Sequence, residues 1–342
     1  MAKKTKPVDM LDDDLKDFYT LVDKQIRPGA GRPKGEEAAP TEFLSTGSLG
    51  VDFVSHGGIP RGRISEIYGP QHSGKTTLMM STAGRVQQAG GRVAWLDMEF
   101  GFDPTWATTL GVDIRTLHID NFDTAEEALT FIDLVVRSHK FDLVVVDSVA
   151  AMVPSVEAQE VYGKAHMGLQ ARVMSQGARK LVGPIGRSRT AVVFLNQIRN
   201  KIGVTYGSPE VTTGGMALQF YASLRLNVRQ RKPIKDGEEL LGNYVEVTAK
   251  KCRAGAYGRQ ALVPLYFLSG IDTGMEVVDA AAKAELVKKS GSHYSYEGEK
   301  MGQGARKAAN WLLEHPEVMA TLWEQLLEVY AREQTNVGTI EE

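Results

Sequence analysis

The sequence predicts an α/β fold with a mostly parallel central sheet, a tethered N-terminal helix and a small C-terminal domain that is mainly helical. Between about residues 44 and 272, short apolar runs rich in β-branched residues alternate with helical stretches. This alternation is typical of a parallel sheet covered by helices on both faces. After residue 273 the strand signal fades. The chain has 342 residues, 42% of them hydrophobic, which suffices for one large core and an appendage.

The N-terminal segment is expected to be a helix over residues 9–26. Apolar residues recur there in steps of three and four: Leu11, Leu15, Phe18, Val22 and Ile26. Residues 27–42 are dominated by Pro, Gly and charge, which predicts a linker. The apolar stripe must be buried, either on this chain's own core or on a neighbouring subunit. We therefore assign residues 1–43 to a docking helix and its linker.

Four apolar runs predict the central strands, at residues 64–68, 92–97, 143–148 and 191–196. They place the core domain at residues 44–272. Helical patterns at 277–289 and 305–333 predict a C-terminal domain over 273–333, with Pro316 breaking or restarting the last helix. Residues 334–342 are expected to be a frayed tail.

The overall composition limits the classes of function. A net charge of −2 gives no general attraction for nucleic acid, so local basic loops would have to hold it. Basic residues gather in 225–259 and acidic residues in 314–342. The single Cys252 excludes an intramolecular disulfide and fits a reducing compartment. We find no secretion signal and no apolar run of about 20 residues, and expect a cytoplasmic protein without membrane contact.

A glycine-rich motif, GPQHSGKT, runs from Gly69 to Thr76 and matches GxxxxGK[ST]. It follows a predicted strand and precedes a predicted helix, so backbone N–H groups would ring the phosphates of a nucleotide. Lys75 would reach the β- and γ-phosphates, and the Thr76 hydroxyl would hold Mg²⁺. The imidazole of His72 is expected in solvent. The predicted nucleotide-binding set is Gly69, Pro70, Gln71, His72, Ser73, Gly74, Lys75, Thr76 and Thr77.

Three polar residues stand at or just past predicted strand ends. Asp147 ends the run LVVVD, where a buried carboxylate needs a cation such as Mg²⁺. Glu99 can deprotonate a water for in-line attack, which means hydrolysis; Asp97 is its rival as the base. Gln197 ends the fourth run, and its amide can bond a γ-phosphate.

Two loops are expected to leave this edge of the sheet. The stretch 197–215 has four glycines and no periodicity, and long loops without structure are usually functional. Arg199 and Lys201 supply its positive charge. The other loop covers about 156–168 and follows the Asp147 strand. In chain order, 156–168 is called the first loop and 197–215 the second loop.

Several segments resemble the RecA family of bacterial and phage recombinases. They are GPQHSGKTT, MEFGFDP, VVVDSVAAMVP, HMGLQARVMSQ, FLNQIRNKIGV and PEVTTGG, and the likeness extends from LSTGSLGVD (44–52) to YSYEGEKMGQG (294–304). The resemblance implies an ATP- and Mg²⁺-dependent filament on single-stranded DNA that pairs with a homologous duplex and exchanges strands. It also implies DNA-stimulated ATP hydrolysis and roles in DNA repair and the SOS response.

The resemblance also implies roles for single residues. Lys75, Thr76 and Asp147 would bind Mg-ATP, with Glu99 as the catalytic base and Gln197 as the γ-phosphate sensor. Asp103 and Trp106 fall where the family holds the adenine, and Lys251 and Arg253 where two cations reach a neighbouring subunit's phosphates. The implied DNA-contacting residues are Met167, Gly168, Arg172, Arg179, Ile202, Gly214 and Gly215, beside the basic Arg199 and Lys201.

Two departures, the unusual linker and the short tail, favour a divergent member such as one encoded by a phage. Two other classes of function compete. A hexameric helicase predicts a large separate N-terminal domain, whereas this chain has a single tethered helix. A non-catalytic ATP-binding assembly factor predicts a damaged catalytic set, whereas Lys75, Thr76, Glu99, Asp147 and Gln197 are all present.

Overall fold

The computed structural model of the chain describes residues 16–26, 30, 40–160, 168–200 and 210–336. The chain divides into two compact units, the first ending at Thr41. The first unit contains helix α1 (Lys16–Gln25), which confirms the expected N-terminal helix over its described part. Phe18 and Ile26 of the predicted stripe are 49% and 70% exposed. Burial of this stripe on a neighbouring subunit stays a prediction.

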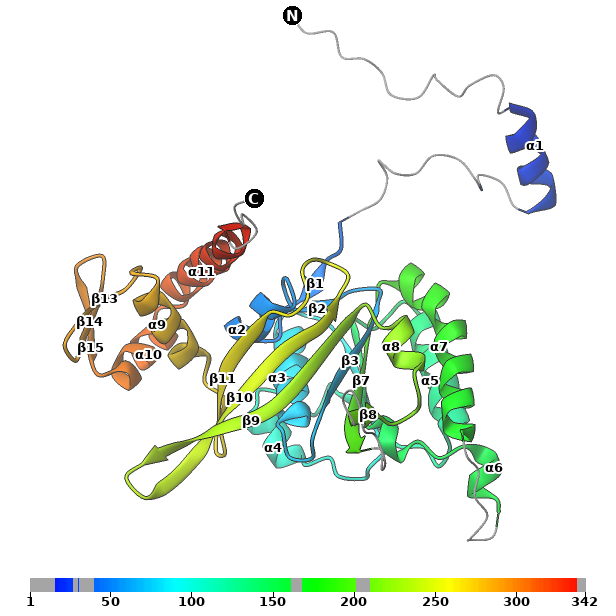
Figure 1. Cartoon of the computed structure of the whole chain (residues 1–342), viewed down its shortest axis with the longest axis horizontal. Helices are drawn as coiled ribbons and strands as arrows, with labels where there is room; N and C mark the ends of the chain where they lie inside the picture. The colour runs from blue at the N-terminus through cyan, green and yellow to red at the C-terminus, as the bar shows by residue number, and fades with distance from the viewer. Residues whose placement is uncertain (1–15, 27–29, 31–39, 161–167, 201–209, 337–342) are drawn as a thin grey trace, which may run out of the picture. The chain divides into compact units, whose positions relative to one another are not determined.

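The second unit is built on a ten-stranded sheet with the order β12-β11-β10-β9-β3-β7-β6-β4-β5, and β8 pairs with β7 beside that path (Figure 1). Strands β5, β4, β6, β7, β3 and β9 run parallel, which confirms the mostly parallel core, whereas β9 to β12 are antiparallel. The strands are β3 (Ile64–Gly69), β4 (Val93–Asp97), β5 (His118–Asp120), β6 (Leu143–Asp147), β7 (Ala191–Asn200), β8 (Glu210–Thr212), β9 (Leu224–Asp236), β10 (Glu239–Cys252), β11 (Gln260–Tyr266) and β12 (Gly270–Ile271). A separate pair joins β1 (Phe43–Leu44) to β2 (Ile59–Pro60).

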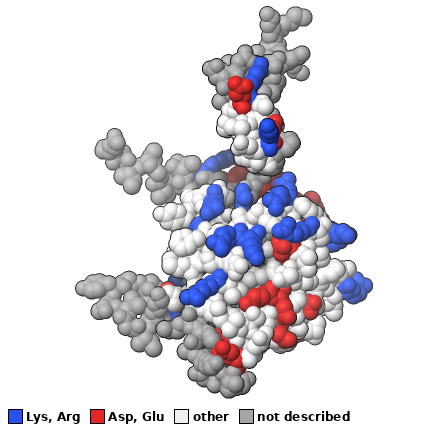
Figure 2. Space-filling model, turned by 90° about the vertical axis from the view of Figure 1, so that its right-hand side faces the viewer, with Lys and Arg blue, Asp and Glu red and all other residues white. Residues whose placement is uncertain are grey.

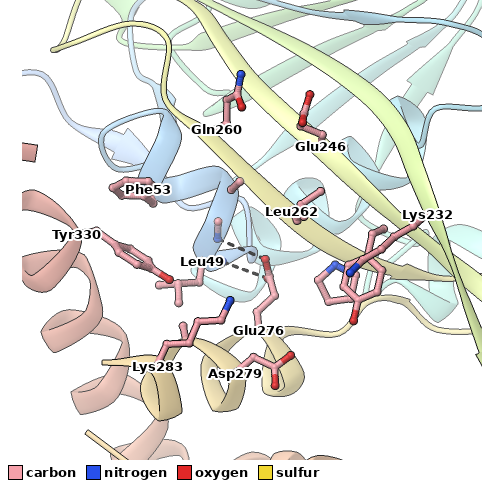
Figure 3. Close-up of a pocket in the computed structure, with 15 residues that line it drawn as sticks. Leu49, Phe53, Lys232, Glu246, Gln260, Leu262, Glu276, Asp279, Lys283 and Tyr330 are labelled. Atoms are coloured by element: carbon pink, nitrogen blue, oxygen red, sulfur yellow. Dashed lines mark hydrogen bonds between the residues drawn. The ribbon is translucent and has the colours of Figure 1, made fainter. Parts of the chain in front are cut away.

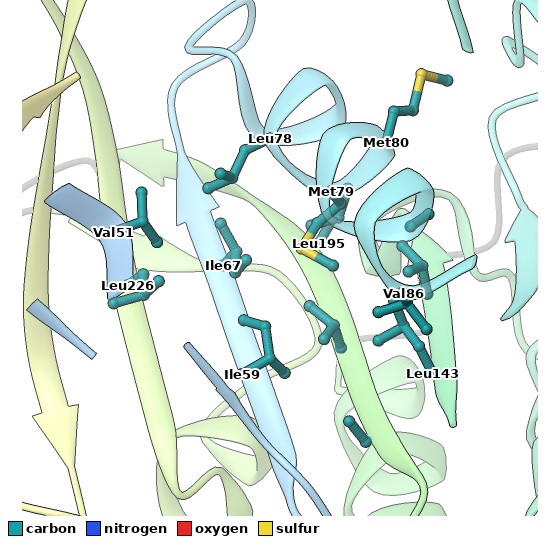
Figure 4. Close-up of a cluster of buried hydrophobic side chains, with 14 of the residues drawn as sticks. Val51, Ile59, Ile67, Leu78, Met79, Met80, Val86, Leu143, Leu195 and Leu226 are labelled. Atoms are coloured by element: carbon teal, nitrogen blue, oxygen red, sulfur yellow. The ribbon is translucent and has the colours of Figure 1, made fainter. Parts of the chain in front are cut away.

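Helices cover both faces of this sheet, as the alternating sequence pattern predicts. Figure 4 shows one face, where Leu78 and Met79 of helix α3 pack with Ile67 and Leu195 of the central strands. Burial of each such side chain contributes about 1.5–3 kcal/mol. The first face carries α2 (Leu49–Val54), α3 (Lys75–Gln88) and α4 (Pro104–Thr109). The other elements are α5 (Ala125–Arg137), the 3₁₀ helix η2 (Val149–Ala151), α6 (Ser155–Ala158), α7 (Leu169–Ser188) and α8 (Ala217–Tyr221), with α5 and α7 packed on the second face.

The stretch 197–215 corrects one prediction. It was expected to lack regular structure, but β7 continues to Asn200 and β8 returns antiparallel to it, with Ile198 opposite Thr212. The cause is that backbone groups leaving the sheet pair with each other instead of with water. Residues 201–209 lie outside the described residues.

The C-terminal region is mainly helical, as predicted, with a small antiparallel sheet. Its elements are α9 (Thr273–Lys283), β13 (Lys288–Ser290), β14 (His293–Tyr296), β15 (Glu299–Gln303), α10 (Ala305–Glu314) and α11 (Pro316–Asn336). Pro316 starts a new helix, as expected. The predicted C-terminal boundary of the helix over 277–289 was wrong, because α9 ends at Lys283. Glu285 takes a left-handed φ of 59°, which stops α9, and the chain then enters β13.

A buried carboxyl joins this region to the core. Glu276 on α9 accepts a hydrogen bond from the Ser48 hydroxyl at 2.8 Å. It also accepts from the backbone nitrogens of Leu49 and Gly50 at 3.2 and 3.3 Å (Figure 3). These donors form the N-terminus of α2, where free N–H groups need acceptors. Burial raises the pKa of Glu276 to about 8. Glu276 therefore holds α9 against α2, beside a cavity of about 590 Å³.

Candidate active site

The polar residues predicted at the strand ends meet at one edge of the sheet. Gly69 on β3 lies opposite Gln197 on β7, and Asp97 on β4 lies opposite Asp147 on β6. The carboxyl ends of parallel strands share an edge, and ligands of open α/β sheets bind outside it. The tertiary structure thus assembles the four predicted strand ends into one site.

Two glycines of the phosphate loop allow the backbone to pack closely against neighbouring strands. Gly74 precedes α3 with a left-handed φ of 91°, and a Cβ added there would lie 2.7 Å from Leu265. A Cβ added at Gly69 would lie 2.1 Å from the carbonyl oxygen of Val228. Only glycine therefore fits at these two positions. The result is a cradle of backbone N–H groups at the N-terminus of a 14-residue helix, which attracts anions.

Lys75 lies inside this cradle and is only 9% exposed. Its Nζ donates hydrogen bonds to the carbonyl oxygens of Pro70 at 2.7 Å and Gly69 at 3.3 Å. Burial lowers the pKa of Lys75, an effect that the nearby carboxylates of Asp147 and Glu99 oppose. A buried ammonium needs acceptors, and phosphate oxygens are stronger acceptors than backbone carbonyls.

Thr76 and Asp147 form an oxygen pair suited to a hard cation. The Thr76 hydroxyl donates to Asp147 Oδ2 at 2.8 Å. Burial raises the pKa of Asp147 to about 6, and the charges of Glu99 and Asp97 act in the same direction. A divalent cation would offset both the burial and this repulsion. Mg²⁺ prefers such oxygen ligands together with the phosphates of a nucleotide, so the residues present fit it.

Glu99 contacts Gln197, as well as the end of β6. Its Oε1 accepts a hydrogen bond from Gln197 Nε2 at 2.9 Å and another from the Ser148 hydroxyl. Asp97, the alternative candidate for the base, contacts backbone groups instead. It is buried and accepts from the backbone nitrogens of Gly101 and Phe102, so it shapes the turn after Glu99. Among the described residues, Glu99 lines the cavity of this site, whereas Asp97 does not.

A cavity of about 400 Å³ joins these groups. It is lined by the loop residues Gln71 to Thr77 and by Glu99, Trp106, Asp147 and Gln197. Trp106 donates from Nε1 to the Thr77 hydroxyl at 3.4 Å. Asp103 lies outside the lining and caps α4 by accepting from the backbone nitrogens of Thr105 and Trp106. His72 is exposed, as expected.

Sequence reasoning missed six residues that line the cavity: Ser148, Gln230, Asn243, Val245, Leu265 and Phe267. Gln230 donates from its side chain to the His72 carbonyl at 2.6 Å, which holds the phosphate loop. Except for Ser148, they come from β9, β10, β11 and the turn after β11. No local pattern could have identified these five, because the antiparallel pairing that brings these strands to the loop is long-range.

Lys251 and Arg253 do not line the cavity among the described residues. Lys251 Nζ donates to the carbonyl oxygens of Gln219 at 2.7 Å and Phe220 at 2.9 Å, and Arg253 donates to the Phe220 carbonyl at 3.5 Å. Both cations thus gather at the end of α8. Within one chain, the structure does not bring them to the phosphate loop.

The expected DNA-contacting residues are only partly described. Met167, Lys201 and Ile202 lie outside the described residues. Arg172, Arg179 and Arg199 are exposed, and Gly168 immediately precedes α7 with a φ of 78°. A Cβ added at Gly214 would lie 2.9 Å from Val149, and one at Gly215 would lie 2.6 Å from Ala171. The described end of the second loop therefore packs against the start of α7, beside the end of the first loop.

Charge is unevenly spread on the α7 side of the molecule. Helix α7 and the residue after it expose Arg179, Lys180, Arg187 and Arg189. Figure 2 shows Lys and Arg gathered on one part of this face, and Asp and Glu on another. A chain with a net charge of −2 thus still offers a local basic surface.

Two family models match the chain. The RecA N-terminal domain matches residues 15–272, and the RecA C-terminal domain matches residues 275–331. Among curated proteins, the chain is similar to Protein RecA of Dichelobacter nodosus, with 46% identity over 87% of this chain and 86% of that protein. It is 45% identical to Protein RecA of Leptospira biflexa, over 91% of this chain and 81% of that protein.

Among solved structures, the chain is similar to the crystal structure of the RadB recombinase. The TM-score is 0.51 with 22% sequence identity, over 67% of this chain and 98% of that chain. This likeness concerns the fold. Among the described residues of the present chain, no helix is both long and apolar enough to cross a membrane.

Proposed function

The chain belongs to the RecA family, and we propose that its strand-end residues bind Mg-ATP and couple the γ-phosphate to DNA held by the two loops. ATP-dependent recombination with DNA-dependent ATP hydrolysis is the activity of this family. The matches over residues 15–272 and 275–331 set aside the hexameric helicase and the non-catalytic assembly factor. The observation that supports the proposal most is the contact between Glu99 and Gln197 at the phosphate loop.

Lys75, Thr76 and Asp147 form the nucleotide part of the proposed site. The Lys75 ammonium exchanges its two loop carbonyls for oxygens of the β- and γ-phosphates. Thr76 and Asp147 hold Mg²⁺, which neutralises charge on the phosphates when it is bound. Trp106 offers a flat apolar face to the adenine, with Asp103 at the start of the same helix.

Glu99 and Gln197 form the reactive part. Glu99 accepts a proton from the water that attacks the γ-phosphate, and Ser148 orients its carboxylate. Gln197 turns its amide between Glu99 and the γ-phosphate. Because Gln197 lies on β7, which leads into residues 201–209, its position reports the phosphate to the second loop.

The proposed partners are single-stranded DNA, a homologous duplex and further copies of this chain in a helical filament. Lys251 and Arg253 do not line the nucleotide cavity of their own chain. We therefore assign them to the phosphates of a nucleotide bound by a neighbouring copy. Arg172, Arg179 and Arg199 hold the DNA backbone. Met167 and Ile202 of the expected set wedge between bases. We assign residues 273–333 to a C-terminal domain. The single Cys252 is compatible with action in the cytoplasm, where thiols stay reduced.

A strand-exchange assay tests this proposal. The purified chain is mixed with circular single-stranded DNA and a homologous linear duplex, and joint molecules are counted with and without ATP. We expect joint molecules only with ATP and Mg²⁺, and none with Lys75→Ala. Electron microscopy with an ATP analogue that resists hydrolysis should show filaments on the DNA. Rings without filaments, or joint molecules without nucleotide, would overturn the proposal.

A further inference from the structure

A line of polar side chains crosses four adjacent strands of the sheet, β10, β9, β3 and β7. Lys251 on β10 lies opposite Arg225 on β9, and Arg225 lies opposite Glu66 on β3. Phe194 on β7 lies opposite Glu66, and Asn196, two residues further along β7, reaches Glu66 diagonally by a hydrogen bond. Glu66 and Asn196 are both fully buried, at 0% exposure. A buried charge is costly unless it is paired and hydrogen-bonded, so this line calls for an explanation beyond packing.

Glu66 joins the two halves of the line. Its Oε2 accepts from Arg225 Nε at 2.5 Å, and its Oε1 accepts from Asn196 Nδ2 at 2.9 Å. Each carboxylate oxygen thus has a partner on a different neighbouring strand. Removing either partner would leave the buried carboxylate of Glu66 without full compensation of its charge.

Asn196 uses all of its hydrogen-bonding capacity. Its Nδ2 donates to Glu66 and also to the Thr213 carbonyl at 3.0 Å. Its Oδ1 accepts from the Thr213 hydroxyl and from the backbone nitrogen of Gln197 at 2.9 Å. An amide has two donors and one oxygen with two lone pairs, and all four are engaged here. Neither an apolar residue nor a carboxylate could replace it.

These bonds join the two ends of the second loop. Gln197 follows Asn196 on the strand that leads into residues 201–209, and Thr213 follows the strand that leads out of them. Gly214 and Gly215, which pack against η2 and α7, come next. The backbone of Gln197 and the returning strand are therefore held by one side chain.

We propose that Asn196, supported by Glu66, is a positioning residue that makes the backbone of Gln197 and Thr213 move as one unit. This inference rests on the proposed function, in which the Gln197 amide moves between Glu99 and a γ-phosphate. A fully satisfied buried amide resists separate movement of its partners, because any one lost bond leaves an unpaired polar group. A shift of Gln197 is thereby passed to Thr213 and to the glycines beside α7. The loop responds to the nucleotide from both of its ends.

Thr213 provides the sharpest test, because it lies outside the nucleotide cavity and is half-buried. Thr213→Val and Thr213→Ala remove the hydroxyl that bonds Asn196, whereas Thr213→Ser keeps it. The readout is the ATP-induced gain, the ratio of the Kd values for a labelled oligo-dT without and with a non-hydrolysable ATP analogue. It is measured by fluorescence anisotropy at one fixed salt concentration.

We expect the ATP-induced gain to be about tenfold smaller in Thr213→Val and Thr213→Ala than in the wild type. This decrease corresponds to about 1.4 kcal/mol of coupling free energy. Thr213→Ser should retain the gain. Affinity for a fluorescent ATP analogue without DNA should stay within about twofold in all three variants. Thr213→Val and Thr213→Ala should still unfold cooperatively, but at a lower Tm than Thr213→Ser, because Asn196 loses a hydrogen-bond partner. A purely structural role would lower stability and leave the gain unchanged.

Failure of this inference and failure of the proposed function would give different results. If either hydroxyl-free variant folds normally and keeps the full gain, Asn196 does not position the loop, and the inference is wrong. If the wild-type chain itself shows no ATP-induced gain, the proposed coupling of nucleotide to DNA fails instead.

Discussion

The side-chain amide of Gln197 donates a hydrogen bond of 2.9 Å to Oε1 of Glu99, although 98 residues separate them in the chain. The same oxygen accepts the Ser148 hydroxyl. The proposed γ-phosphate sensor, Gln197, and the proposed base, Glu99, are therefore joined directly by a hydrogen bond. An amide that turns to a phosphate would leave Glu99 free to take a proton from water, so phosphate sensing and base activation would be one event.

Gln197→Ala should uncouple ATP from DNA. ATP binding without DNA should change little, because the Lys75 contacts stay intact. The ATP-induced gain in affinity for single-stranded DNA should collapse; such couplings are typically about 1–3 kcal/mol. Anisotropy on a labelled oligonucleotide measures the gain. Gln230→Ala is the matched control: it removes another amide of the same cavity, one that bonds the phosphate loop, and should keep the gain. A full gain in Gln197→Ala would place the switch elsewhere.

Glu99→Gln should bind ATP and hydrolyse it about 10²–10⁴-fold more slowly, since it removes only the base. Filaments on DNA should then persist longer. Phosphate release measures the rate. Asp97→Asn should chiefly lower stability, because Asp97 holds the backbone of Gly101 and Phe102. Hydrolysis by Glu99→Gln at nearly the wild-type rate would shift the role of base to Asp97.

Lys251→Ala and Arg253→Ala should each weaken ATP-dependent assembly, and the double variant should weaken it most. Each change removes a cation that we assign to a neighbour's phosphates, while ATP binding by the single chain should survive. Sedimentation with ATP and single-stranded DNA measures assembly. Lys232→Ala on β9 offers a control of equal charge, because the Lys232 ammonium lies over the ring of Tyr244, seven residues from Lys251 on β10. Unchanged assembly in the double variant would remove both residues from the interface.

Glu276 should make stability depend on pH. Its pKa is about 8 in the folded chain, against an ordinary value of 4.5, so the folded state holds this proton more tightly than the unfolded state. Stability is therefore lost as the pH rises toward and through 8. Between pH 7 and pH 9 this group should lower the free energy of unfolding by on the order of 1 kcal/mol.

Urea unfolding at the two pH values measures this loss. Glu276→Gln cannot ionise and should show a smaller loss, whereas Asp279→Asn, an exposed acid of the same cavity, should behave like the wild type. Equal losses in the wild type and Glu276→Gln would show that this carboxyl is not the group responsible.

Local patterns in the sequence determined the phosphate loop, the four central strands, the strand-end residues and the Pro316 break. These features depend on residues close together in the chain: a glycine spacing, an apolar run or a proline that cannot continue a helix. They placed Lys75, Thr76, Asp147 and Glu99 correctly at one edge of the sheet, because the carboxyl ends of parallel strands must meet there.

Only the tertiary structure decided which side chains touch. The antiparallel strands β9 to β11 bring Gln230 and Leu265 to the cavity, and β8 turns an expected loop into a pair of strands. The Glu99–Gln197 and Glu66–Asn196 contacts likewise span 98 and 130 residues. Strand register and buried hydrogen bonds are set by partners distant in the chain, and no window of sequence contains both members of such a pair.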